Sequence, residues 1–103
     1  MYAPRPLSVD TLAAAVAHRV DLAPALRSRM LGGDNGPVAL RYARGCLYLA
    51  LWHSGRSWSQ VAASVGASPS YVRQAVVEAQ RDRRRLPLLR ACVALGVTPA
   101  RSA

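Results

Sequence analysis

Four side chains in the second half of the sequence have the chemistry that reads the edges of DNA bases. Arg73 can donate two hydrogen bonds to guanine, Gln74 can pair with adenine, and Val77 can contact the methyl group of thymine. Ser70 precedes Arg73 and Gln74 by three and four residues, so all four side chains share one face of a helix. We therefore expect these four residues to contact bases in the major groove. The alternative is an ordinary solvated helix face.

The residues around this face fit a helix-turn-helix, the unit that presents one helix to the major groove. Ala62 is small enough for two helices to cross closely, and Gly66, four residues later, suits the left-handed backbone of the turn. Val72, six residues further on, can return an apolar side chain to the core. The other inward positions are Val61, Val65, Ala67, Ala75 and Val76. The pattern therefore predicts a helix-turn-helix over Trp58 to Val77.

Two N-terminal caps frame this motif. Ser57 and Gln60 have the spacing of a capping box, which starts its first helix. Ser68 followed by Pro69 is an N-cap with proline at the first helical position, and it opens a second helix that we expect to reach about Arg85. Ser68 and the N–H groups at this helix start are placed to hold a phosphate.

Charge gives a second reason to expect a polyanionic partner. The chain has 14 basic residues against five acidic ones, a formal net charge of +9, and every basic residue is an arginine. Arginine forms bidentate hydrogen bonds with phosphate and guanine. We expect phosphate contacts from Arg41, Arg44, Arg56, Arg81, Arg84 and Arg85. The alternatives are a basic surface that serves solubility alone and, for the run near Arg84, stabilisation of a helix C-terminus.

The sequence shows no arrangement typical of a catalytic or metal site. Its five acidic residues are scattered, it has no glycine-rich phosphate loop, and His18 and His53 are lone histidines. Cys46 and Cys92 lack a metal-ligand spacing, and we expect both to be small buried residues in a reducing compartment. We therefore expect neither an enzyme nor a cofactor.

The sequence favours a cytoplasmic protein associated with the nucleoid. Nothing at the N-terminus resembles a secretory signal. The apolar run from Cys46 to Trp52 is much shorter than the roughly 20 residues that span a bilayer. We therefore expect no membrane contact.

The remaining residues predict the helices that must position the motif. The expected helices are 8–19, a short one capped by Asp21, then 37–54, 57–66, 68–85 and 88–95, with Pro87 separating the last two. Apolar residues surround most of 37–54, which predicts a central buried helix. Trp52 and Trp58 are expected to anchor the core, and the alternative for Trp58 is a phosphate contact through its indole N–H. The pattern predicts an all-α protein, a compact bundle of about six helices. One domain covers 8–96, between a flexible arm over 1–7 and a tail over 97–103.

The motif resembles the helix-turn-helix of phage repressors and the Trp repressor. Over roughly Leu7 to Leu95 the layout is also similar to the C-terminal DNA-binding domain of the bacterial replication initiator DnaA. It has an amphipathic helix, LSVDTLAAAVAHRV, a loop with basic flanks, a long helix opened by VALRYARGCLYLAL, and then the helix-turn-helix. In that family the basic loop works beside the recognition helix, so the resemblance implies that Arg27, Arg29 or Arg41 contacts phosphate or the minor groove.

The sequence departs from the initiator family where that family reads its DNA site. The Asp-His-Thr signature at the start of the recognition helix is absent, and Ser68-Pro69-Ser70 stands in its place, with one residue fewer in the turn. The resemblance therefore does not carry over the initiator's binding site.

Three functions remain open from the sequence. The first is a transcriptional regulator, most simply a repressor encoded by a phage or mobile element, and the second is a replication or nucleoid factor. The third is a protein-interaction module, but the arginine excess favours double-stranded DNA as the partner. The last helix, with Leu88, Leu89, Val93 and Leu95, either closes the core or pairs two subunits. A homodimer would bind two half-sites about one helical turn apart.

Overall fold

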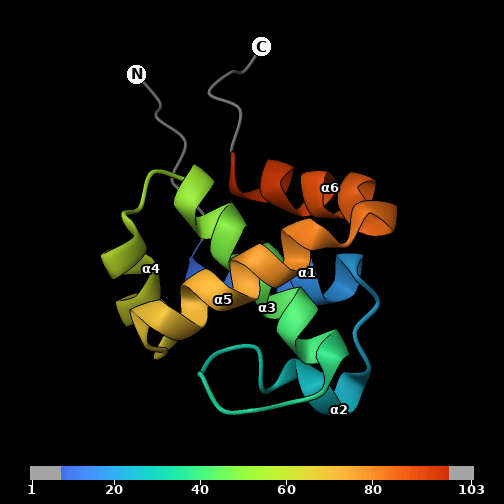
Figure 1. Cartoon of the computed structure of the whole chain (residues 1–103), viewed down its shortest axis with the longest axis horizontal. Helices are drawn as coiled ribbons and strands as arrows, with labels where there is room; N and C mark the ends of the chain where they lie inside the picture. Colours follow the sequence, from blue (N-terminus) through green and yellow to red (C-terminus); the bar gives the residue numbers. More distant parts are fainter. Residues whose placement is uncertain (1–7, 98–103) are drawn as a thin grey trace.

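The computed structural model describes residues 8–97, which form six α-helices and no strand (Figure 1). The helices are α1 (Val9–Arg19), α2 (Pro24–Arg27), α3 (Val38–His53), α4 (Trp58–Val65), α5 (Pro69–Arg81) and α6 (Leu86–Gly96), with a 3₁₀ turn at Arg83–Arg85. The predicted all-α bundle is confirmed. The arm expected over 1–7 and residues 98–103 of the expected tail lie outside the described residues.

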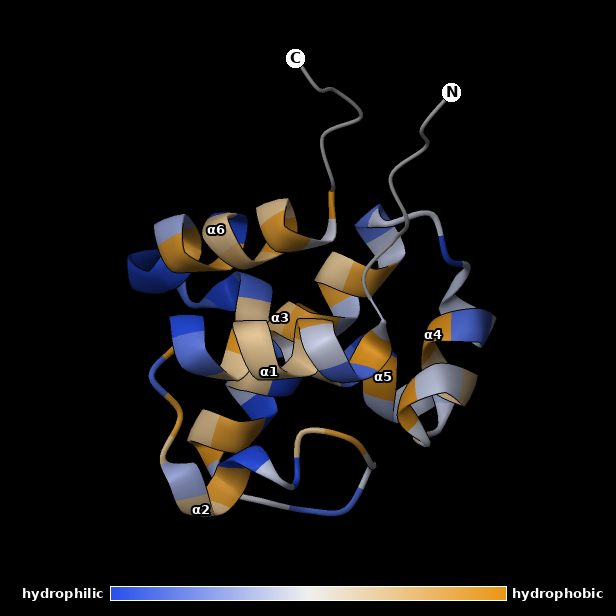
Figure 2. Cartoon of the chain, turned by 180° about the vertical axis from the view of Figure 1, so that it is seen from behind, coloured by the Kyte–Doolittle hydropathy of each residue, from blue (hydrophilic) through white to orange (hydrophobic). Residues whose placement is uncertain are grey.

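The central helix is α3, as its apolar surround predicts. It packs against α1, α4, α5 and α6, and every residue from Tyr42 to Leu51 is buried. Gly45 lets α5 approach closely, because a Cβ there would lie 2.5 Å from the carbonyl oxygen of Ala75. On another side, Gly96 of α6 meets the backbone of Ala50 equally closely. Seen from behind, α1 lies across α3 with α6 beside it, and apolar segments recur along all three helices (Figure 2).

The serine caps predicted from the sequence are all present. The Oγ atom of Ser8 accepts from the backbone N–H of Thr11 at 3.1 Å and starts α1. Ser57 and Gln60 form the reciprocal capping box of α4, with bonds of 2.8 and 3.1 Å. Ser68 caps α5. These local signals place the starts of α1, α4 and α5 at their predicted positions.

The prediction that Asp21 caps the second helix is wrong. Residue Ala23 precedes α2, whereas Asp21 has a positive φ of 55° and ends α1. The N–H of Leu22 bonds to the carbonyl of Ala17 at 2.9 Å, and that of Asp21 bonds to His18 at 3.1 Å. This pair of bonds is the Schellman arrangement that closes a helix C-terminus. It also buries Leu22 in the core.

The fifth helix is shorter than predicted, since α5 ends at Arg81 and not at Arg85. Asp82 leaves the helical backbone with ψ of 87°, and the chain turns back into α6, where Pro87 lies inside the first turn rather than between two helices. The hydroxyl of Tyr42 donates to the carbonyl of Arg85 at 3.1 Å and holds this turn. The reversal carries Leu89 and the rest of the apolar face of α6 back onto α1 and α3, so α6 closes the core.

Two other expectations about the interior have opposite outcomes. Cys46 and Cys92 are free and buried, as predicted. The prediction that Trp52 and Trp58 anchor the core is wrong, since they are 41% and 39% exposed. They stand at the end of α3 and the start of α4, on either side of the connection between these helices, and neither ring is enclosed. Within residues 8–97, none of the helices combines the length and apolar character that crossing a bilayer needs.

Candidate nucleic-acid interface

Two consecutive helices, α4 and α5, joined by a tight turn occupy the segment for which the sequence predicts a helix-turn-helix. Gly66 follows α4 with φ 71° and ψ 35°, the left-handed conformation, and α5 begins three residues later. The inward face of α5 is formed by Val72, Ala75, Val76 and Ala79, all buried. Because α5 has one buried stripe, the opposite stripe is free to meet a ligand.

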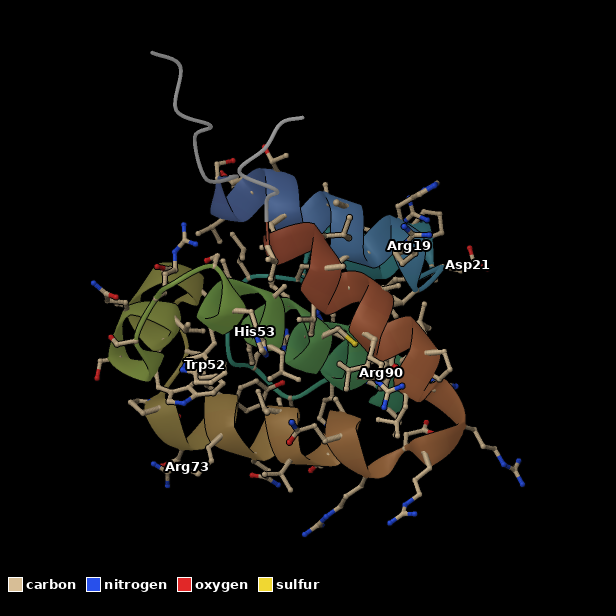
Figure 3. The ribbon with its side chains drawn as sticks, turned by 90° about the horizontal axis from the view of Figure 1, so that it is seen from above. Arg19, Asp21, Trp52, His53, Arg73 and Arg90 are labelled. Atoms are coloured by element: carbon tan, nitrogen blue, oxygen red, sulfur yellow. The ribbon has the colours of Figure 1, made fainter. Side chains whose placement is uncertain are left out.

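That opposite stripe contains the four predicted base-reading residues. Ser70, Arg73, Gln74 and Val77 are all exposed. Figure 3 shows Arg73 on the outer side of α5, pointing away from the rest of the protein. Within residues 8–97, Arg73 makes no hydrogen bond or ion pair, so its guanidinium can present both N–H edges to a base. The amide of Gln74 donates to Glu78 at 3.2 Å, a bond that pairing with adenine would replace.

One side of α5 is lined by polar groups, and we call Asn35, Arg41, Tyr71, Gln74 and Glu78 the polar flank. Arg41 lies 3.5 Å from Glu78 and donates to the carbonyl of Gly36 at 3.0 Å. These residues line a hollow of about 180 Å³. Arg41 is half-buried, and its Nε and Nη1 atoms already face these partners, so a phosphate would bind its remaining N–H groups.

Arg44 is the one predicted phosphate contact that does not reach the surface. Its side chain is fully buried, so the prediction that Arg44 contacts phosphate is wrong. Its guanidinium donates to the carbonyls of Arg29 and Asp34, to the carboxylate of Asp34 at 2.8 Å and to the hydroxyl of Tyr71 at 3.0 Å. A buried arginine must have such partners, because an unsatisfied buried charge is strongly unfavourable. Arg44 therefore ties the loop 28–37 to both α3 and α5.

The carboxylate of Asp34 lies at the surface and bonds to both Arg29 and Arg44, and we call these three residues the loop clamp. It accepts from Arg29 at 2.7 Å and from Arg44 at 2.8 Å. The hydrogen bonds from Arg29 and then from Arg44 lower the pKa of Asp34 to about 2. Arg29, a predicted phosphate contact, is thus already paired, and it also donates to the carbonyl of Asn35. No local pattern in the sequence links Asp34 with Arg44, since their pairing spans ten residues.

The loop 28–37 lies beside the turn of the helix-turn-helix. The N–H of Gly32 donates to the carbonyl of Val65 at 2.6 Å, and the hydroxyl of Tyr48 donates to the carbonyl of Gly32 at 3.4 Å. Gly33 lies close to Ala67, because a Cβ added at position 33 would lie 3.1 Å from the Cβ of Ala67. Arg27, before this loop, is exposed and donates to the carbonyl of Leu22. The structure therefore brings the arginine-flanked loop against the turn between α4 and α5.

The remaining predicted phosphate contacts differ in how far other groups already engage them. Arg81 and Arg84 are exposed and, within the described residues, make no ion pair. Arg85 lies 3.4 Å from Asp82 and over the ring of Tyr42. The remaining two are Ser68, which is exposed and caps α5, and Arg56, which bonds to Ser54 at the α3–α4 connection. Arg81 and Arg84 are thus the better-placed cations.

The other side of α5 carries a feature that the sequence did not indicate. A groove of about 170 Å³ opens there, lined by Trp58, Pro69, Val72, Arg73, Val76 and Val77. Trp58 was expected in the core, and only its exposure in the structure reveals that this side of the helix is apolar. The two sides of α5 therefore differ in chemistry.

Within residues 8–97, no cluster of three His, Cys, Asp or Glu residues can hold a metal ion. No family model matches the sequence, and neither the curated proteins nor the solved structures contain a significant match to the chain.

Proposed function

We propose that this chain binds double-stranded DNA in a sequence-dependent manner, with α5 as the recognition helix in the major groove. The observation that carries the proposal is the exposure of Arg73, Gln74 and Val77 on the stripe of α5 that faces away from its buried stripe. The left-handed turn at Gly66 supports it, because this turn sets the crossing of the two helices in the motif.

In this proposal, base contacts and phosphate contacts come from different residues. Arg73 reads guanine, Gln74 reads adenine and Val77 meets a thymine methyl, and each good bidentate pair contributes about 1–3 kcal/mol of discrimination. Arg81 and Arg84 neutralise phosphates, together with Ser68 at the start of α5. The net charge of +9 supports this sequence-independent part of the affinity.

The biological role that we propose is transcriptional regulation, most simply repression by occupying an operator. Repression needs only that a site be covered, which a chain with one recognition helix can do. The protein would then be a DNA-binding factor rather than an enzyme, acting at the nucleoid in the cytoplasm.

A second candidate is a factor that acts at replication origins. The observation that favours it is the loop 28–37, held beside the helix-turn-helix by Gly32 and Arg44. The same pairing of a basic loop with a recognition helix is what the resemblance to the initiator's DNA-binding domain implies. Footprints on genomic fragments distinguish the two roles, since a regulator protects promoter sites and a replication factor protects clusters near an origin.

Selection of bound duplexes from a random DNA pool tests the proposal directly. We expect a defined site in which Arg73→Ala relaxes the preference at one base pair. Arg84→Ala is the matched arginine control, and it should weaken all sequences alike and lower the salt dependence of binding by about one unit. Equal losses from both variants, or no DNA retained at low salt, would contradict the proposal. A palindromic site with half-sites one helical turn apart would indicate a homodimer.

A further inference from the structure

The apolar side of α5 carries an exposed pair of tryptophans. The rings of Trp52 and Trp58 stack with their centroids 5.2 Å apart and their planes at 6°, yet the two residues remain 41% and 39% exposed. A contiguous apolar patch on a protein surface commonly marks a binding site. Tryptophan is also among the residues that contribute most to the binding energy of protein interfaces. The pair therefore marks this side of the molecule as a docking surface.

The tryptophan pair joins two grooves into one surface. Trp58 lines the groove of about 170 Å³ beside α5. His53 packs edge-on against Trp52, with ring centroids 4.9 Å apart, and lines a second groove of about 620 Å³ between α3, α5 and α6. The floor of this second groove includes Leu49, Leu86, Leu89, Val93 and Val97. We call the whole surface, from Trp58 through Trp52 and His53 to Val93 and Val97, the apolar flank.

The larger groove of the apolar flank shares no residue with the proposed base-reading surface, whereas the smaller groove shares Arg73 and Val77 with it. In Figure 3, His53 and Arg90, which line the larger groove, are labelled on α3 and α6, and Trp52 lies at the end of α3 beside α4 and α5. Arg73 lies at the outer edge of α5 and points away from these residues (Figure 3). A ligand in the larger groove and a duplex on α5 would therefore occupy different sides of the helix.

The charges around the apolar flank indicate what can cover it. Arg73 and Arg90 are the charged residues among those that line the two grooves, and no described carboxylate lines either of them. A second copy of this chain, which also carries a net charge of +9, would bring like charges together across the contact. A phosphodiester backbone would pair with the arginines but would leave the apolar floor without a partner.

We propose that the apolar flank binds an acidic amphipathic helix of a partner protein. Apolar side chains at every third or fourth position of such a helix fill the two grooves and cover the tryptophans. Glu or Asp residues beside that stripe pair with Arg90 at one end and Arg73 at the other. The proposal does not rest on DNA binding, because the larger groove uses none of the residues that we assign to base contacts. A partner helix that also fills the smaller groove would compete with DNA for Arg73 and Val77.

A peptide selection with a built-in choice of charge tests this proposal. The probe is a displayed library of helix-forming, tryptophan-free peptides with a fixed leucine stripe and with Glu, Lys or Gln at each flanking position. We expect retained peptides to be enriched in Glu. Both tryptophans of the chain lie on the apolar flank, so binding of a selected synthetic peptide should shift their fluorescence emission to the blue.

Matched variants locate the binding surface. Ala94→Glu adds a carboxylate at an exposed position of the larger groove, and Ala14→Glu makes the same change on the exposed side of α1. We expect Ala94→Glu to weaken peptide binding at least tenfold and Ala14→Glu to leave it unchanged. Arg90→Glu, also exposed, should weaken binding to a similar extent, and circular dichroism confirms that each variant is folded.

Several results would overturn the proposal. They are enrichment of Lys or Gln, no retained peptide, an unchanged emission spectrum, or equal binding by the Ala94→Glu and Ala14→Glu proteins. A concentration-dependent dimer in sedimentation that Ala94→Glu abolishes would assign the surface to a second copy instead. Gel shifts with the selected DNA, run on the same variants, show separately whether the proposed function holds.

Discussion

The two sides of α5 differ in chemistry and in how far the rest of the chain covers them. On the polar flank, the loop 28–37 is fastened to α3 and α5 through Arg44, whose guanidinium is saturated by the protein's own acceptors. On the apolar flank, Trp52 and Trp58 stack on each other, with His53 edge-on to Trp52, and both tryptophans keep much of their surface in water. One side of α5 is thus completed within the chain, whereas the other presents apolar surface to solvent.

The same difference distinguishes residues that hold the fold around α5 from residues whose side chains are free to contact a ligand. Arg44 and Arg73 carry the same charge, but Arg44 is buried among four acceptor atoms, and Arg73 is exposed. A count of arginines treats the two alike. The number of acceptors around each guanidinium distinguishes a structural arginine from one that can bind a ligand.

The largest effect on this comparison should come from replacing Arg44. Arg44→Met keeps most of the side-chain volume but leaves the carbonyls of Arg29 and Asp34 without their charged donor. We expect a loss of about 2–4 kcal/mol in the free energy of unfolding, since hydrogen bonds to charged groups are among the stronger ones. Urea unfolding followed by circular dichroism measures this loss. Amide exchange at Gly32 should also accelerate, because the loop is released from the turn.

The control for that experiment is Arg41→Met, a change of the same type on the same helix. Arg41 is partly exposed and its pair with Glu78 is long, at 3.5 Å, so its removal should change stability by less than about 1 kcal/mol. Similar losses from Arg41→Met and Arg44→Met would show that burial does not set the importance of an arginine here.

The apolar flank can be perturbed independently, through the close contact between α6 and α3. Gly96→Ala places a methyl group against the backbone of Ala50, and backbone atoms cannot move aside as a flexible side chain would. We expect the end of α6 to shift, with a loss of about 1–2 kcal/mol from overpacking. Thermal unfolding measures the loss. Amide exchange at Gly32 should remain slow, and an unchanged melting temperature would contradict the close contact.

The sequence predicted those parts of the interface that depend on neighbours along the chain. The caps at Ser57 and Ser68, the turn at Gly66 and the buried stripe of α5 all follow from residues within four positions of each other. The burial of Arg44 and the exposure of Trp58 do not, because each depends on where another element packs. The early end of α5 belongs to the same class, since α6 must fold back onto α3.

The smallest effect should appear at acid pH, where the loop clamp loses its charge. Asp34 has its pKa lowered to about 2 by Arg29 and Arg44, from an ordinary value of 3.8. Its contribution to stability is therefore fully present above the ordinary value and is lost as the pH falls toward 2. Asp34 is exposed, and water and salt screen this contribution. Asp34→Asn should flatten the decline in stability between about pH 4 and pH 2, whereas Asp10→Asn should retain it. Unfolding curves measured at each pH test this, and an equal flattening in both variants would show that the clamp adds nothing beyond ordinary surface charge.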